Sequence, residues 1–332
     1  KSGSLKTRTK YYISSMIAKF VNASSADGYN PYRITRDGID WEVPEPDNPW
    51  LNIGYWGDHQ IIYLLRLMEV SERYLPGRLI SWLDREMFVY ARIPYRIKPY
   101  EDIYRNPHDS VVFDRELHEA IISRLAGTGA DAKLVPGPSG DIMKVTFTEK
   151  LLCSLLAKLS NFIPGGGIWM NTLRPEWNDA NNALVGYGVS MVTLYYMRRF
   201  IRFITGLFSS APSEEFSISV EMAGFMERAG EAFRLSSGAL AEGFTDETRK
   251  TLTDQLGTAG SQYRDQVYKG FCGKKTNLKK DDLTGFLDLV LAYMDQSITL
   301  NKRKDAMYNA YNLVSLKPGA ITVSPLHEML EG

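Results

Sequence analysis

The sequence has few cysteines, no excess of either charge and no long uninterrupted apolar run. Its only two cysteines, Cys153 and Cys272, are too few and too far apart to indicate a disulfide framework or a redox compartment. Lys and Arg together number 39, and so do Asp and Glu. A protein that binds nucleic acid usually carries a basic excess to neutralise phosphates. We therefore expect no nucleic-acid partner.

Membrane spans and metal sites are equally poorly supported. The longest apolar stretch, residues 186–208, is interrupted by three arginines and is typical of a core helix rather than a membrane span. The four histidines show no metal-ligand spacing and no cysteine partner: they are His59, His108, His118 and His327. We expect no membrane partner, no bound metal and no cofactor.

The dominant periodicity is that of amphipathic helices. Apolar residues recur at helical spacing in residues 5–22, 58–74, 78–92, 114–126, 147–160, 182–207, 217–234, 246–270, 278–297 and, more briefly, 303–314. No strand alternation extends beyond a few residues, so we expect an all-α fold.

The helices differ in how apolar they are, and this predicts their arrangement. Residues 183–197 are apolar on nearly every face and residues 58–70 on all but a narrow stripe, so both should be surrounded by protein. Residues 114–126 and 246–270 have one charged side and should lie outside. An inner ring of helices inside an outer ring, without a fixed repeat, predicts a closed toroid.

The chain begins without Met at Lys1 and ends at Gly332, soon after a promising helical segment. We expect residues 1–332 to form a single helical catalytic domain excised from a longer chain. Other domains of that chain are its expected partners.

Tryptophans gather in the loops. Trp41, Trp50 and Trp56 lie in a long loop at 24–57, and Trp169 and Trp177 in a Gly-rich one at 161–181. Flat aromatic faces in loops suit the C–H faces of sugar rings. The alternative is that these side chains close the end of a helix bundle.

Two polar motifs open helices that should be inner ones. In YWGDHQ, Tyr55–Gln60, the Asp58 carboxylate either caps the following amides or faces the toroid mouth and binds sugar hydroxyls. In RPEWNDANNALVG, residues 174–186, two carboxylates three positions apart flank an indole. Such surroundings can raise the pKa of one carboxyl and keep the other ionised, as acid catalysis on a glycosidic oxygen requires. Alternatively, Asp179 or Asn181 caps the next helix and Glu176 pairs with Arg174.

Both motifs resemble those of a known enzyme family. The segment PGGGIWMNTLRPEWNDANNALVGYGVSMVTLYYM and the earlier NIGYWGDHQIIYLLRLMEV are similar, in order and separation, to stretches of cellobiose and chitobiose phosphorylases and cyclic β-1,2-glucan synthases. The resemblance covers about residues 50–210. It implies an (α/α)6 toroid of the six-hairpin glycosidase type.

The resemblance also implies roles for residues. Asp179 corresponds to the family's general acid, Glu176 to the first carboxylate of the same motif, and Asp58 to a sugar-binding Asp. Gly57 stands where the family usually has a second Asp, and the late phosphate-binding segment is not found. Around these we expect Trp50, Trp56, Trp169, Arg174 and Trp177 to bind substrate.

The sequence thus predicts an inverting enzyme acting on a β-glucan or related oligosaccharide or polysaccharide, with hydrolysis ahead of phosphorolysis. Inorganic phosphate would be a co-substrate only of a phosphorylase. For hydrolysis, Glu328 and Glu331 are the candidate general bases, although both also fit a solvated terminal helix. The alternative is a non-catalytic carbohydrate-binding or scaffold domain.

Overall fold

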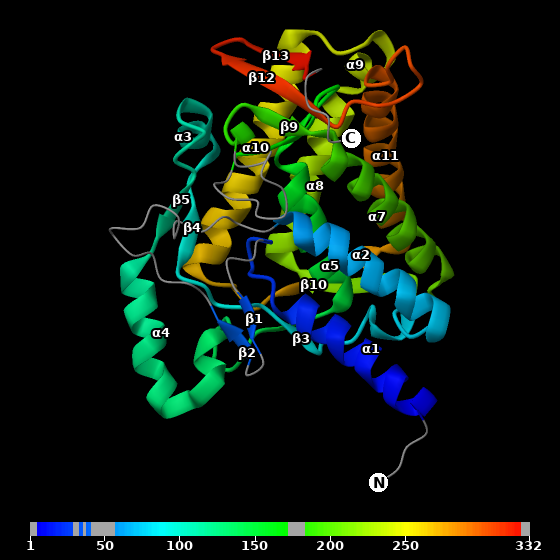
Figure 1. Cartoon of the computed structure of the whole chain (residues 1–332). Helices are drawn as coiled ribbons and strands as arrows, with labels where there is room; N and C mark the ends of the chain where they lie inside the picture. The colour runs from blue at the N-terminus through cyan, green and yellow to red at the C-terminus, as the bar shows by residue number, and fades with distance from the viewer. Residues whose placement is uncertain (1–4, 29–32, 36–37, 41–56, 172–182, 327–332) are drawn as a thin grey trace.

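The computed structural model describes residues 5–28, 33–35, 38–40, 57–171 and 183–326 (Figure 1). Its α-helices are α1 (Leu5–Asn22), α2 (Gly57–Tyr74), α3 (Tyr100–Arg105), α4 (Arg115–Thr128), α5 (Phe147–Leu159), α7 (Met191–Ser210), α8 (Val220–Leu235), α9 (Ser237–Glu242), α10 (Asp246–Lys269) and α11 (Lys280–Leu300). Short 3-10 helices cover Ile80–Trp82 and Gly129–Lys133.

The described strands have two to seven residues. They are β1 (Arg33–Thr35), β2 (Gly38–Asp40), β3 (Phe88–Val89), β4 (Tyr95–Ile97), β5 (Val111–Phe113), β6 (Lys144–Val145), β7 (Phe162–Ile163), β8 (Gly167–Trp169), β9 (Gly188–Ser190), β10 (Glu215–Ser219), β11 (Lys275–Lys279), β12 (Tyr311–Lys317) and β13 (Ala320–Pro325). Five of them form one antiparallel sheet in the order β13-β12-β9-β8-β7, and the others pair two by two.

The expected all-α toroid of the six-hairpin type is wrong. The chain is 57% helical and 18% strand, and its five-stranded sheet makes it a mixed α/β protein. Within that sheet β9 pairs with β8 on one side and with β12 on the other, so segments more than 120 residues apart meet there. Strands β7, β8 and β9 have only two or three residues and leave no alternation to read, and β12, the partner of β9 on one side, lies far away in the sequence.

Two expected helices are replaced by other structure. Residues 303–314 were predicted to be helical, but Tyr311 opens strand β12, which forms a hairpin with β13 around Pro318–Gly319. A Pro-Gly pair between two apolar runs is a turn signal that the helical interpretation overlooked. Residues 78–92 contain a 3-10 turn and strand β3 instead of a continuous helix.

Most of the other helices lie where the periodicity places them. The predicted segments 5–22, 58–74, 114–126, 147–160, 246–270 and 278–297 coincide with α1, α2, α4, α5, α10 and α11 to within a few residues. The segment 182–207 is only partly helical, because β9 occupies residues 188–190 before α7 begins.

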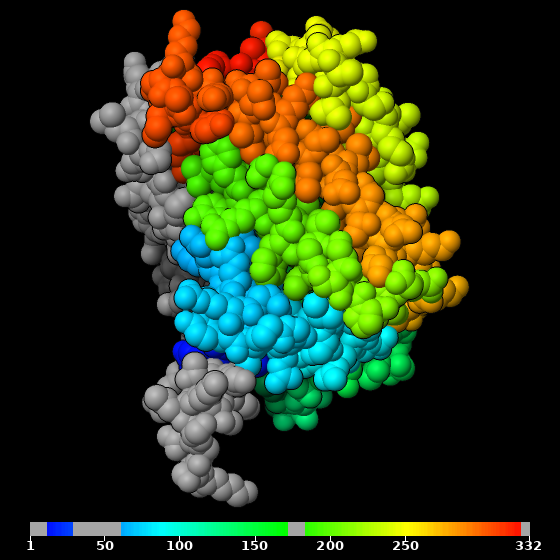
Figure 2. Space-filling model, turned by 90° about the vertical axis from the view of Figure 1, so that its right-hand side faces the viewer, coloured from blue at the N-terminus to red at the C-terminus, as the bar shows by residue number. Residues whose placement is uncertain are grey.

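Helix α5, rather than α2 or the segment 183–197, is the most enclosed helix. Every residue from Phe147 to Leu159 is buried, and the helix packs against α2, α8, α10 and β10. Helix α2 instead exposes one side, including Tyr63 and Arg66. Helices α1, α2, α7 and α11 pack in that order, and Figure 2 shows the last three side by side across one face. None of the described helices is long and apolar enough to span a bilayer.

Candidate functional site: a polar pocket beside the segment 23–28

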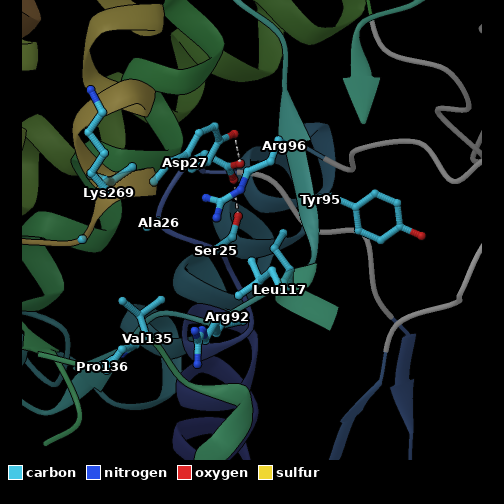
Figure 3. A pocket seen from close by; sticks show the side chains of 15 residues that line it. Ser25, Ala26, Asp27, Arg92, Tyr95, Arg96, Leu117, Val135, Pro136 and Lys269 are labelled. Carbon is cyan, nitrogen blue, oxygen red and sulfur yellow. Dashed lines mark hydrogen bonds between the residues drawn. The ribbon is translucent and has the colours of Figure 1, made fainter. Parts of the chain in front are cut away.

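A pocket lies where the segment after α1, the strand region around β4 and the last turn of α10 meet, and Leu117 of α4 with Val135 and Pro136 completes its wall (Figure 3). Its cavity is about 190 Å³. The charged and hydroxyl side chains on its wall come from the segment after α1, the β4 region and α10; they include Ser25, Asp27, Arg92, Arg96, Tyr268 and Lys269.

Hydrogen bonds from side chains of α5 and α10 hold the segment 23–28 in place. All six of its residues are buried. The Nζ of Lys150 donates to the Ser24 carbonyl at 3.0 Å and to the Val89 carbonyl at 2.8 Å. The Tyr263 hydroxyl donates to the Ala26 carbonyl at 2.7 Å. Buried backbone carbonyls that follow the end of a helix have no helical hydrogen-bond partner, so they need other donors. Here side chains supply these donors.

Asp27 is the buried carboxylate of this pocket, with only 3% of its surface exposed. One of its oxygens accepts a hydrogen bond from the Tyr268 hydroxyl at 2.7 Å, and the other accepts from the Ser25 hydroxyl. The Tyr268 oxygen in turn accepts from the Ile97 amide at 2.9 Å. Burial and the neighbouring Asp27 raise the pKa of Tyr268, so this phenol stays protonated and acts as a donor.

Two guanidinium groups face the same pocket with different partners. The Nε of Arg96 pairs with Asp114 at 3.1 Å, and its guanidinium carbon lies 4.4 Å from the centre of the Tyr268 ring. Arg92 has no such anchor. Partial burial lowers its pKa, and the nearby positive charges of Arg124 and Arg96 lower it further.

A layer of buried polar groups on α5 lies next to the segment 23–28. Glu149 accepts from the Ser219 amide at 2.7 Å and from the Ser219 hydroxyl at 2.8 Å, and burial raises its pKa. Burial lowers the pKa of Lys150 to about 7, and its Nζ lies 4.0 Å from the centre of the Tyr90 ring. The Cys153 thiol lies in the same layer, where burial raises its pKa to about 12. A thiol held protonated in this way is a poor nucleophile.

Most of the residues that the sequence singled out lie outside the described part of the chain. These are Trp41, Trp50, Trp56, Arg174, Glu176, Trp177, Asp179, Glu328 and Glu331. Their predicted roles stay predictions.

Two predicted substrate-binding residues can be placed in the fold. Asp58 is the second residue of α2, in its first turn. Trp169 ends strand β8 and is 2% exposed; its indole nitrogen donates to the Gly186 carbonyl at 2.9 Å. The Trp169 side chain therefore lies inside the protein and joins two segments that flank residues 172–182.

Helices α2 and α7, which belong to the two motif regions, pack side by side and run in the same direction. In their middle, Arg199 of α7 donates to Glu69 of α2 at 2.6 Å. Ser213, three residues after α7, donates a hydrogen bond to Asp84, ten residues after α2, and Figure 1 shows the carboxyl ends of the two helices on one side of the molecule. Their amino ends, where Asp58 lies, consequently share the opposite side.

Asp27, Arg92 and Arg96 were not predicted from the sequence as pocket residues. The available signals were the Asp-Gly pair at 27–28 and the charged residues within the otherwise apolar and aromatic run from Phe88 to Ile97. Neither signal shows that α10, about 240 residues after Asp27, completes the pocket. Among the described residues no group of His, Cys, Asp and Glu is arranged to hold a metal ion.

Neither comparison of the sequence with known proteins identifies a relative. No protein-family model matches the chain, and no curated protein matches it.

Proposed function

We propose that this chain is a carbohydrate-active enzyme that cleaves glycosidic bonds of a β-glucan or related oligosaccharide with inversion, by hydrolysis or phosphorolysis. The proposal rests on the two motif segments, YWGDHQ and RPEWNDANNALVG, and does not need the toroid. The observation that carries it is the parallel packing of α2 and α7. Motif regions that are more than 100 residues apart in the sequence thereby contribute neighbouring helices to one face.

The proposed chemistry divides the motif residues by role. Asp179 is the proposed general acid, which protonates the leaving glycosidic oxygen, and Glu176 orients the substrate or supports the acid. Asp58, in the first turn of α2, is proposed to accept hydrogen bonds from sugar hydroxyls. Water activated by a general base, or inorganic phosphate, attacks the opposite face of the sugar.

The test is the release of reducing sugar from a panel of β-glucans, with and without inorganic phosphate. Asp179→Asn removes the transferable proton and keeps the side-chain shape, so turnover should fall about 10²–10⁴-fold. A substrate with an activated aryl leaving group needs less protonation and should be affected far less. Asp288→Asn, at an exposed position of α11, is the matched control and should keep full activity.

Full activity of Asp179→Asn on an unactivated glucan would exclude Asp179, and Glu176→Gln would become the variant to assay. If no glucan is cleaved under either condition but oligosaccharides bind, the chain is the non-catalytic binding domain instead. Neither cleavage nor binding across the panel would end the carbohydrate proposal.

A further inference from the structure

Arg92 is a half-buried cation without a partner in the described part of the chain. Its side chain makes no hydrogen bond or ion pair with any described residue, and its Nη1 atom is enclosed by protein. Burying a charged donor without an acceptor costs free energy. A protein can keep such a group when an acceptor arrives from outside.

The surroundings of Arg92 add positive charge. Arg96 lines the same pocket and uses only its Nε for Asp114, so its two Nη groups donate to no described residue. Arg124, on α4, is exposed and also forms no ion pair with the described residues. The positive charges of Arg124 and Arg96 both lower the pKa of Arg92, so each of them acts electrostatically on this group. A bound anion would offset this effect.

The polarity of the pocket wall is suited to an oxyanion. Guanidinium groups present paired N–H donors whose spacing matches carboxylate and phosphate oxygens. The Asp27 carboxylate works against an anion, but its oxygens already accept hydrogen bonds from Ser25 and Tyr268. The apolar side chains of Val135 and Leu117 complete the wall and suit the carbon skeleton of a small molecule.

We propose that this pocket binds the phosphate or carboxylate group of a small molecule between Arg92 and Arg96. The cavity of about 190 Å³ accommodates such a group with a few attached atoms. The inference does not rest on the proposed glycosidic activity, because it uses other residues and its test needs no glycan.

The test is isothermal titration calorimetry of the full chain with inorganic phosphate, with acetate and with acetamide, which is a neutral isostere of acetate. Phosphate or acetate should bind, and acetamide should give no heat of binding. Arg92→Met keeps the apolar stem and removes the charge, so affinity for the anion should fall about tenfold or more. Arg92→Lys keeps the charge without the paired donors, so its affinity for the anion should lie between those of the wild type and Arg92→Met. Arg105→Met is the matched control, since Arg105 is exposed and pairs with Asp102 away from this pocket.

A second variant tests the sign of the charge effect. Asp27→Asn removes the negative charge from the wall and keeps one acceptor oxygen, so the anion should bind several-fold more tightly. Raising the salt concentration should weaken binding in both proteins. Thermal melts of every variant check that it is folded.

Several results would overturn the proposal. Absence of both phosphate and acetate binding up to about 10 mM would do so. So would equal losses in Arg92→Met and Arg105→Met, or weaker anion binding in a folded Asp27→Asn. Binding of only one of the two anions would support the pocket and identify which group it prefers.

Discussion

Helices α4 and α5 are neighbours in the sequence and opposites in their surroundings. In α4 only Ile121 is buried, and the helix lies at the edge of the molecule (Figure 1). In α5 every residue is buried, including Glu149, Lys150 and Lys158. Both have mixed polar and apolar sequences; the charged side of α4 predicted its outer position, but nothing local marked α5 as fully enclosed. The difference is that partners from distant parts of the chain surround α5, and some of them pair with its charged groups.

The clearest way to test this comparison is to add one methyl group beside each helix. Gly28 has φ +82°, and a Cβ there would lie 2.5 Å from the Ala157 Cβ and 2.9 Å from the Cys153 carbonyl oxygen, both on α5. Gly129, which ends α4, has φ +58° but open space around it. Gly28→Ala should cost about 3–5 kcal/mol of unfolding free energy, from backbone strain plus overpacking.

Gly129→Ala should cost only the backbone strain, about 1–3 kcal/mol. Urea unfolding followed by circular dichroism measures both. Equal losses in the two variants would mean that α5 and the segment 23–28 are not in close contact. If Gly28→Ala does not fold, recovery of folding at low temperature or with osmolyte still ranks it below Gly129→Ala.

The pH dependence of stability should distinguish the buried charge of α5 from an exposed one. The pKa of Lys150 is lowered to about 7 by burial, against 10.5 for a free lysine. Between these values the unfolded chain binds more protons than the folded one at this residue. The stability of the wild type relative to Lys150→Met should therefore rise with pH from about 7 to about 10, by at most about 1.4 kcal/mol per pH unit.

Below about pH 7 the lysine is charged in both states, and the difference between the two proteins should be constant. Chemical unfolding at several pH values measures it, with Lys302→Met at an exposed position as the control. Parallel stability curves for the wild type and Lys150→Met between pH 7 and 10 would show that Lys150 keeps its proton, held by the Ser24 and Val89 carbonyls.

The contrast between α4 and α5 also shows which features of the fold can be predicted from the sequence. Periodicity located both helices, because an amphipathic pattern is local and does not depend on what covers it. Periodicity did not show that α5 is the enclosed helix, because a buried Glu149 or Lys150 cannot be distinguished in the sequence from a solvated Glu or Lys. Their acceptors and donors come from Ser24, Val89 and Ser219, far away in the sequence.

The sheet and the pocket were missed for a related reason. Strand β9 has only three residues, and it can be recognised as a strand only by its pairing with β8 and β12. Asp27 and Tyr268 are separated by 241 positions and meet at 2.7 Å. Local motifs, in contrast, could be found without the fold, and the resemblance at 164–197 was read from them. That resemblance suggested a toroid which the sheet contradicts, so the motif and the architecture are separate inferences.

The smallest expected effects concern the caps of the two helices. Thr146 caps α5: its hydroxyl accepts from the Glu149 amide at 3.2 Å and donates to the Ser217 carbonyl at 2.9 Å. Asp114 caps α4 by accepting from the Leu117 amide at 2.9 Å, and it also pairs with Arg96. Thr146→Ala and Asp114→Ala should each cost about 1 kcal/mol, since that is the usual loss of a side-chain cap.

The dependence on ionic strength should distinguish the two caps, although the expected costs of losing them are similar. The Thr146 cap is buried and neutral, so its loss should be the same at low and high ionic strength. Part of the Asp114 effect is its partly exposed ion pair, which is worth less than about 1 kcal/mol and is screened. Asp114→Asn keeps a capping oxygen and removes only the charge, so its cost should shrink as salt is added. A salt-dependent loss for Thr146→Ala, or a salt-independent loss for Asp114→Asn, would contradict the contrast between an enclosed helix and a solvated one.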